Sequence, residues 1–150
     1  MTVDPRPQGP GFRFPEAAMR AGAVLETVIY ATDIAAARRF YGDVLGLDLH
    51  LAEDGHFAFF RCGAQMLLIF HPDYAGRPDG HLPHHGTRGP GHLCFRADTP
   101  EELDLWRARL TAEGVAIEQE EHWPRGGRSF YFRDTAGNSL EFAEPRIWGM

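Results

Sequence analysis

Residues 24–47 have the sequence VLETVIYATDIAAARRFYGDVLGL, and this stretch decides the fold class. It opens with apolar and β-branched residues up to Tyr30, a run that predicts a short strand. Asp33 follows as a helix N-cap, and apolar side chains then recur at helical spacing until Gly46, a residue typical of helix ends. The stretch therefore predicts a strand followed directly by an amphipathic helix. The apolar face of that helix consists of Ala37, Phe40, Tyr41, Val44 and Leu45.

Three short strands are predicted after this helix, at residues 47–53, 56–61 and 65–70. Asp54-Gly55 between the first two is a strong hairpin signal. From His71 to Gly91 the chain is dense in Pro, Gly and His and has no apolar period, which predicts a linker.

The same order of elements returns after the linker. A strand is predicted at residues 92–97, and Thr99-Pro100-Glu101-Glu102 has the form of a capping box that opens a second helix. Gly114 ends this helix, and three strands are predicted at residues 115–121, 129–133 and 139–143. The halves also share short sequence motifs, since Phe59-Phe60-Arg61 matches Tyr131-Phe132-Arg133. The sequence thus predicts an α+β protein made of a duplicated βαβββ module.

The predicted organisation has four parts. Residues 1–22 form an irregular Pro-, Gly- and Arg-rich arm, in which Phe12 and Phe14 are possible anchors to the domain or to a partner. The domain proper spans 23–150, with module one at 23–71, a linker at 72–90 and module two at 91–145.

Composition excludes several classes of function. All 15 basic residues are Arg, so Schiff-base lysine chemistry and a P-loop lysine are ruled out, and Ser129 and Ser139 do not lie in a G-x-S-x-G motif. The net charge of -6 and the scattered Arg residues do not predict a nucleic-acid surface or a polybasic membrane patch. Cys62 and Cys94 are not in a C-x-x-C pair. With no apolar span and no signal-peptide pattern, we expect a cytoplasmic protein without membrane or nucleic-acid partners.

Three ionisable residues lie in apolar strand settings. Glu26 and His92 open the first strand of each half, and Glu141 lies between Leu140 and Phe142 in the last strand. Alternation puts each of them on the face away from its helix. Two carboxylates and a neutral imidazole that converge need a cation between them, so we hypothesise one divalent metal held by these three residues. The alternative is that Glu26 pairs with Arg96 and Glu141 with Arg133 or Arg128, and that His92 is a satisfied core residue.

Three segments resemble a known family. Residues 26–47, the run Gly91-His92-Leu93-Cys94-Phe95 and the closing run from Tyr131 to Phe142 are similar to the metal-ligand strands of vicinal-oxygen-chelate proteins, the glyoxalase, bleomycin resistance protein and extradiol dioxygenase superfamily. The resemblance covers roughly residues 24–145. It implies two βαβββ modules whose curved sheets enclose a metal cleft, with Glu26, His92 and Glu141 as ligands, and a homodimer, since many members pair.

Two departures from the family narrow the chemistry. Extradiol dioxygenases and thiol transferases usually have His where this chain has Glu26. Glyoxalase I takes a fourth ligand from the last strand of module one, but that strand here is the apolar run at residues 65–70. His71, one step beyond, is a conceivable substitute and is more readily explained as a loop residue.

The resemblance implies three candidate functions. The first is a lyase or isomerase of the glyoxalase kind, in which a bound Ni, Zn, Mn, Fe or Co ion chelates two adjacent oxygens of a small substrate and Glu141 or Glu26 shuttles a proton. The second is an Fe(II) extradiol-type dioxygenase, for which Tyr131, His84 and His85 are available. The third is a metal-free protein that binds a drug or another small ligand in the manner of bleomycin resistance proteins.

Four residues are candidates for substrate binding. Arg96 is expected on the cleft face beside His92, Tyr131 near the oxygen site and Phe59 among the aromatic residues that line the cleft. Arg128 closes the segment from Trp123, a possible mobile lip that holds an anion. The loop from His81 to His85 is expected to be solvated, and Cys94 is expected on the cleft face without a base to activate it.

Overall fold

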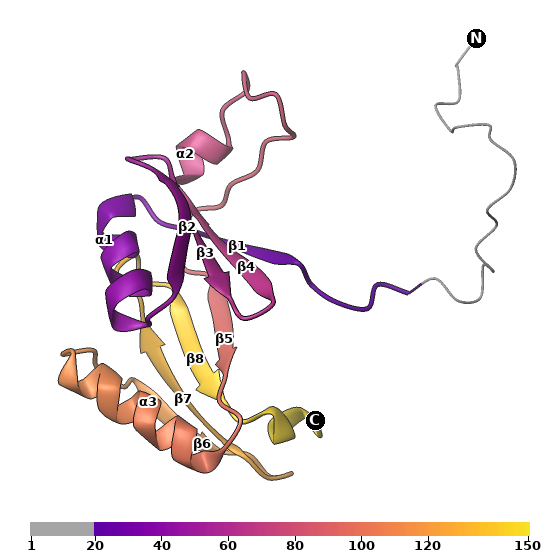
Figure 1. Cartoon of the computed structure of the whole chain (residues 1–150), viewed down its shortest axis with the longest axis vertical. Helices are drawn as coiled ribbons and strands as arrows, with labels where there is room; N and C mark the ends of the chain where they lie inside the picture. Colours follow the sequence, from indigo (N-terminus) through magenta and orange to yellow (C-terminus); the bar gives the residue numbers. More distant parts are fainter. Residues whose placement is uncertain (1–19) are drawn as a thin grey trace, which may run out of the picture.

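The computed structural model describes residues 20–150 and shows two four-stranded sheets with helices along one side (Figure 1). The predicted arm lies almost entirely outside the described residues. The elements of the first half are β1 (Glu26–Tyr30), α1 (Ile34–Arg39), a π-helical turn (Phe40–Val44), β2 (Asp48–Glu53), β3 (Phe57–Cys62), β4 (Gln65–Phe70) and α2 (Pro72–Ala75). The second half contains β5 (His92–Arg96), α3 (Pro100–Ala112), β6 (Gln119–His122), β7 (Arg128–Arg133), β8 (Ser139–Ala143) and a 3₁₀ turn (Pro145–Trp148).

The two sheets have the same topology. Their strand orders are β1-β4-β3-β2 and β5-β8-β7-β6, and in each sheet the first and last strands of the module pair in parallel while the other neighbours are antiparallel. Each sheet is open, with β1 and β5 as edge strands. The prediction of an α+β fold built from two βαβββ modules is confirmed.

The predicted helix caps account for the position of both long helices. Asp33 Oδ1 accepts a hydrogen bond of 2.8 Å from the backbone N–H of Ala36, and Thr99 Oγ1 accepts one of 3.1 Å from Glu102. The carboxylate of Glu102 accepts in turn from the Asp98 N–H at 2.7 Å, which completes the box one residue earlier than the usual pattern. The first helix differs from the prediction in its last turn, because the Leu45 N–H bonds to Phe40 O and widens the helix into a π turn.

Two further elements differ from the prediction. The strand predicted at 115–121 is confined to Gln119–His122, because Val115 N–H bonds back to Leu110 O at the end of α3. Val115 and Ile117 instead pack against the core, so their apolar character reflects packing and not a strand ladder. The linker also contains the short helix α2, which begins at Pro72 after the cap residue His71.

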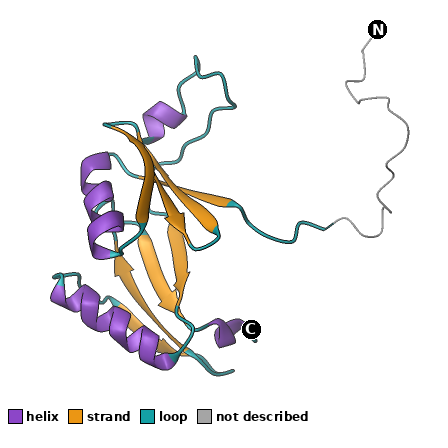
Figure 2. Ribbon diagram, viewed as in Figure 1, coloured by secondary structure: helices purple, strands orange, loops and turns teal. Residues whose placement is uncertain are grey.

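One core joins the two modules on the helix side. The buried side chains of both halves form a single cluster, in which Phe40 of module one lies against Phe132 of module two. Tyr41 donates a hydrogen bond of 2.7 Å to Asp134, and Arg109 on α3 donates to the backbone oxygens of Asp43 and Val44. As a result α1 and α3 lie on the same side of the molecule, and only the short 3₁₀ turn at the C-terminus lies on the opposite side, beside the second sheet (Figure 2).

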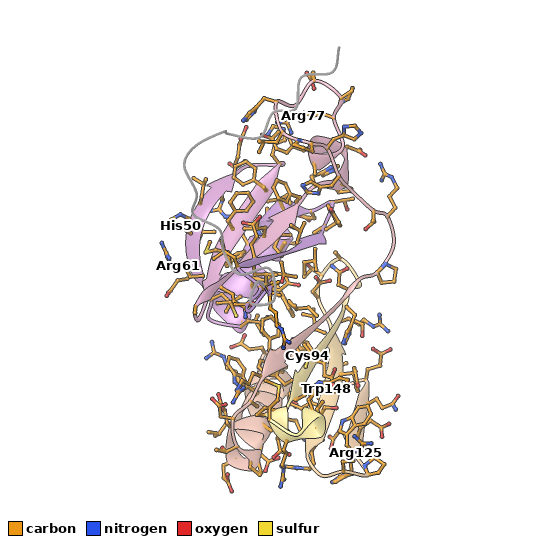
Figure 3. The ribbon with its side chains drawn as sticks, turned by 90° about the vertical axis from the view of Figure 1, so that its right-hand side faces the viewer. His50, Arg61, Arg77, Cys94, Arg125 and Trp148 are labelled. Atoms are coloured by element: carbon orange, nitrogen blue, oxygen red, sulfur yellow. The ribbon has the colours of Figure 1, made fainter. Side chains whose placement is uncertain are left out.

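The uncovered face of each sheet is defined by strand alternation. Leu93 and Phe95 of β5 pack toward the helix-side core, so His92, Cys94 and Arg96 lie on the open face. Figure 3 looks onto this side of the molecule, with Cys94 at mid-height between the two sheets. Within residues 20–150, no helix is long and apolar enough to cross a bilayer.

Candidate metal centre and active site

His92 and Glu141 lie side by side on the open face of the second sheet. His92 is the first residue of β5, and Glu141 is the central residue of β8, the parallel neighbour of that strand. Nε2 of His92 is 3.4 Å from Oε2 of Glu141. Alternation along the two strands predicts that both side chains lie on the face away from the helix.

The start of β5 is fixed by a buried amide. Asn138 Oδ1 accepts a hydrogen bond of 2.8 Å from the Gly91 N–H, and its Nδ2 donates to the backbone oxygen of Tyr30 at 3.0 Å and to Asp134 at 2.8 Å. One side chain thus connects the end of β1, the start of β5 and the turn before β8. This arrangement holds His92 in register beside Glu141.

One hydrogen bond of His92 indicates which of its ring nitrogens donates. Nδ1 lies 3.1 Å from the backbone oxygen of Ser139, and because a carbonyl oxygen only accepts, Nδ1 carries the proton and donates it. In the neutral ring, Nε2 then presents a lone pair to the Glu141 carboxylate. Two acceptors face each other, and a proton or a cation between them is required to make the contact favourable.

Glu141 contains a buried atom without a hydrogen-bond partner. Its side chain is 5% exposed, and Oε1 is the only buried side-chain N or O atom in residues 20–150 that lacks a partner. In the sheet, Glu141 pairs with Cys94 on one side and Tyr131 on the other. Burying a carboxylate oxygen without a partner costs free energy, so this group needs a further ligand.

The two side chains that pair with Glu141 in the sheet have raised pKa values. Burial raises the pKa of the Cys94 thiol to about 12, and the Glu141 carboxylate adds to that rise. The pKa of the Tyr131 phenol is also raised, chiefly by burial, with Glu141 contributing. Both groups are therefore protonated at neutral pH next to a carboxylate, a ring nitrogen lone pair and an unpartnered oxygen. A carboxylate oxygen and an imidazole nitrogen are donor types that divalent cations accept.

The Glyoxalase/Bleomycin resistance protein/Dioxygenase superfamily model matches residues 23–142. The chain belongs to this superfamily.

Solved structures give the same result. A lactoylglutathione lyase from Agrobacterium tumefaciens matches with a TM-score of 0.86 and 44% identity, over 88% of this chain and 100% of that one. A virulence protein from Salmonella typhimurium matches with a TM-score of 0.65 and 25% identity, over 84% and 98%. A glyoxalase/bleomycin resistance protein/dioxygenase from Nocardioides, with a TM-score of 0.68 and 20% identity over 85% and 86%, shares the fold. The search of curated proteins gave no significant match.

Glu26, the third ligand expected from the superfamily resemblance, is not part of the same cluster. It opens β1, is exposed and pairs with Met66 in the first sheet. Across residues 20–150, no three His, Cys, Asp or Glu side chains are gathered closely enough to hold a metal. Within one chain, therefore, His92 and Glu141 of the predicted triad lie together and Glu26 lies apart from them.

The ion pairs that were the alternative to a metal are not formed. Arg96 pairs with Asp98, Arg133 with Glu118 and Arg128 with Asp104. The alternative, in which these arginines neutralise Glu26 and Glu141, is wrong for the described part of the chain. The physical reason is that each guanidinium pairs with an exposed carboxylate: Asp98 follows β5, Glu118 precedes β6 and Asp104 lies on α3.

The candidate substrate residues are distributed over three places. Arg96 shares the open face with His92, and the Tyr131 ring centroid lies 6.2 Å from that of His92. Phe59 lies on the open face of the other sheet, stacked 4.5 Å from Phe57. The structure places Arg128 elsewhere: it donates to Pro100 O at 3.2 Å and to Asp104 at 3.0 Å, at the start of α3. It shares the strand face of Phe130 and Phe132, toward the helix.

Three contacts in the described chain were not predicted from the sequence. His85 was expected in a solvated loop, but Nδ1 lies 2.6 Å from the Tyr30 hydroxyl and its ring contacts Phe70 edge-on. A loop without periodicity gave no signal for this contact. His71 is used as the cap of α2, where Nδ1 accepts from the Asp73 N–H at 3.1 Å. The Asn138 network had a weak signal in the spacing Asp134-x-x-x-Asn138, which forms a tight turn.

Proposed function

We propose that this protein is a metal-dependent lyase or isomerase of the glyoxalase kind that acts on a small compound with two adjacent oxygens. The single observation that carries the proposal is the His92–Glu141 pair, in which Nε2 lies 3.4 Å from Oε2 on the open face and Oε1 is buried without a hydrogen-bond partner. The 44% identity to a lactoylglutathione lyase over the whole of that chain supports the reaction type.

We further propose that Glu26 is the third ligand and reaches the site of a second copy in a homodimer. Glu26 is exposed, and the open faces of both sheets lie on the side of the molecule opposite α1 and α3. Phe57, Phe59 and Phe70 on the open face of the first sheet are half-exposed, an apolar surface that an interface would cover. The first sheet of one copy over the second sheet of its partner brings Glu26 toward His92 and Glu141.

A divalent cation at this site supplies Lewis acidity, which stabilises negative charge that develops on the substrate oxygens. Glu141 is the proton carrier in the proposal, because Oε1 has no other partner and lies in a buried setting. It removes a proton from the carbon that bears one oxygen and returns it to the neighbouring carbon, so the reaction needs no redox partner. Tyr131, next to Glu141 and protonated at neutral pH, donates a hydrogen bond to a substrate oxygen.

The first experiment tests the cation and the proton carrier. Protein purified without added metal is analysed by elemental mass spectrometry, and the hemithioacetals that methylglyoxal forms with glutathione and with smaller thiols are assayed as substrates. We expect about one bound cation per site in the wild type, none in His92→Ala, and a large loss of turnover in Glu141→Gln. The control is Glu118→Gln, which removes an exposed carboxylate that directly precedes β6 and pairs with Arg133. A wild type that stays metal-free in the presence of Zn, Ni, Co, Mn or Fe would favour a small-molecule binding protein instead.

The second experiment tests whether the ligands come from two copies. Glu26→Gln and His92→Ala are each inactive in the proposal, but a mixed dimer contains one site with Glu26 from one copy and His92 and Glu141 from the other. After subunit exchange in a 1:1 mixture, about half of the dimers are mixed and activity returns to about a quarter of the wild-type value. A mixture that stays inactive while size-exclusion chromatography shows exchange places all ligands within one chain.

A further inference from the structure

The outer edge of β5 carries backbone hydrogen-bonding groups that no strand among residues 20–150 takes up. β5 is the last strand of its sheet and pairs only with β8. At the end of this parallel ladder the Ala97 N–H donates to Ala143 O, so the odd-numbered residues of β5 direct their backbone groups toward β8. The N–H and C=O groups of Cys94 and Arg96 therefore point to the free edge. Such an edge is a template for one more strand.

A cavity of about 410 Å³ lies along this edge, between the two modules. Module two lines it with four consecutive residues of β5, 93–96, and module one lines it with Thr27 of β1 and with residues 65–67 at the start of β4. Much of the remaining wall is apolar and consists of Leu45, Leu47, Trp106 and Phe142. The cavity has the size of a ligand site.

The combination of a free strand edge and an apolar cavity indicates the kind of occupant. A small apolar molecule fills the cavity but leaves the backbone groups of Cys94 and Arg96 without partners. An extended peptide pairs with those groups through its own backbone and places alternate side chains in the apolar space. The features of this site therefore favour a peptide with apolar residues at alternate positions.

The N-terminal arm contains a run of this kind. Residues 11–14 have the sequence Gly-Phe-Arg-Phe and are flanked by Pro10 and Pro15. Proline has no backbone N–H, so these two residues limit strand pairing to the run between them. In an extended run the two Phe side chains share one face and the Arg side chain lies on the other. The run lies outside the residues that the structure describes.

The described part of the chain enters the fold beside the cavity. The backbone oxygen of Leu25, the residue before β1, accepts a hydrogen bond of 2.9 Å from the N–H of Met66, which lines the cavity. Val24 and Leu25 are themselves exposed. Phe14 precedes Leu25 by eleven positions, and an extended chain spans up to roughly 3.3 Å per residue. The run can therefore turn back and reach the cavity of its own chain.

We propose that residues 11–14 pair with the free edge of β5 in the same chain and place Phe12 and Phe14 in the cavity between the modules. The added strand gives the backbone groups of Cys94 and Arg96 their partners, and the two rings fill apolar space to which both modules contribute. This inference does not depend on the metal site, because it concerns the edge of the sheet and not its open face.

The experiment measures amide hydrogen exchange in the full-length protein by NMR. The N–H groups of Cys94 and Arg96 should be protected in the wild type. In the double variant Phe12→Ala, Phe14→Ala they should exchange at least about tenfold faster, because the hydrogen bonds to the added strand are lost. The N–H of Phe95, which faces β8, should keep its rate in both proteins and is the internal standard.

Arg13→Ala is the matched control for the double variant. It shortens a side chain in the same run but on the face away from the cavity, so the exchange rates of Cys94 and Arg96 should remain those of the wild type. Equal rates in the wild type and the double variant, whether fast or slow, would show that the run does not pair with β5. The proposed function would be unaffected by that result.

A second measurement uses the wild-type sequence alone. The ring protons of Phe12 and Phe14 should show nuclear Overhauser effects to the methyl groups of Met66 and Leu93, which line the cavity from the two modules. In a mixture of isotope-labelled and unlabelled protein these effects should remain within one chain. Effects between chains would assign the run to the cavity of a second copy and would overturn the proposal, as would their absence.

Discussion

Replacement of Glu141 by Gln should make the metal-free protein more stable while it abolishes the site. In the wild type without a cation, one carboxylate oxygen is buried without a partner and the other faces the lone pair of His92 Nε2 at 3.4 Å. A Gln side chain of the same shape removes the charge, and its N–H donates to Nε2. The unsatisfied group costs about 1–3 kcal/mol, so the variant should gain a similar amount.

With metal bound, the wild type should become more stable than Glu141→Gln. A cation that binds only the folded protein stabilises the wild type by about 2.7 kcal/mol at 100 times its Kd, and the Gln variant, which lacks the carboxylate, gains far less. For a chain of this size each kcal/mol moves Tm by roughly 2–4 °C. Calorimetry of both proteins, at equal concentration and with and without Zn²⁺, shows directly whether the order of their Tm values reverses.

Glu144→Gln is the matched control for this experiment. Glu144 is also buried, at 2% exposure, but its carboxylate accepts from the Arg128 N–H at 2.6 Å and pairs with Arg146 at 3.0 Å. Loss of its charge should therefore destabilise the protein with or without metal. The reasoning is refuted if Glu141→Gln lowers the Tm of the metal-free protein, or if Zn²⁺ raises the Tm of both proteins equally.

Three further predictions concern the frame around the site. Burial raises the pKa of Tyr41 far above its usual range, so the phenol stays neutral in the folded state, whereas the unfolded chain ionises it near pH 10. The free energy of unfolding should therefore fall by about 1.4 kcal/mol per pH unit above that value. In Tyr41→Phe, the urea midpoint measured between pH 8 and 11 should depend less on pH. Asn138→Ala should cost about 2–3 kcal/mol in urea unfolding, because the Gly91 N–H, the Tyr30 oxygen and Asp134 each lose a hydrogen bond; a loss under half of that would show that water replaces the amide. Gly127→Ala should lower Tm by several degrees, since φ is 88° and the new methyl would lie 2.7 Å from Ile147, whereas Gly63→Ala, with a φ of 57° and open space, should cost less.

Local structure was predictable where one short-range signal determined it. The helix caps at Asp33 and Thr99 and the strand at residues 65–70 occur as predicted, because a side-chain oxygen or a short continuous apolar run fixes each of them. Alternation also placed His92 and Glu141 on one face of one sheet. The error at Arg128 arose from a strand start set one residue late, at Ser129; with Arg128 included, alternation puts it with Phe130 toward α3.

The positions set by tertiary contacts were not predictable. The π turn after α1 follows from the packing of Phe40 and Tyr41 into a core shared by both modules, and a helical period does not distinguish it from a regular turn. His85 contacts Tyr30 across 55 positions of sequence. The division of the triad has the same cause: alternation assigns Glu26 and His92 to open faces of two sheets, but it carries no information on which sheet faces which.

The unequal donor content of the two modules has a consequence for the metal site. In the proposed dimer, module two contributes His92 and Glu141 from one sheet, while module one contributes Glu26 across the interface. Ligands held on one sheet pay their ordering cost when the chain folds, whereas Glu26 is positioned only when the copies associate. Dilution to the monomer should therefore weaken cation binding without abolishing it, and Glu26→Gln should raise the Kd less than His92→Ala does. The difference between Glu26→Gln and the wild type should disappear under conditions in which the protein is monomeric, because Glu26 then has no site to complete.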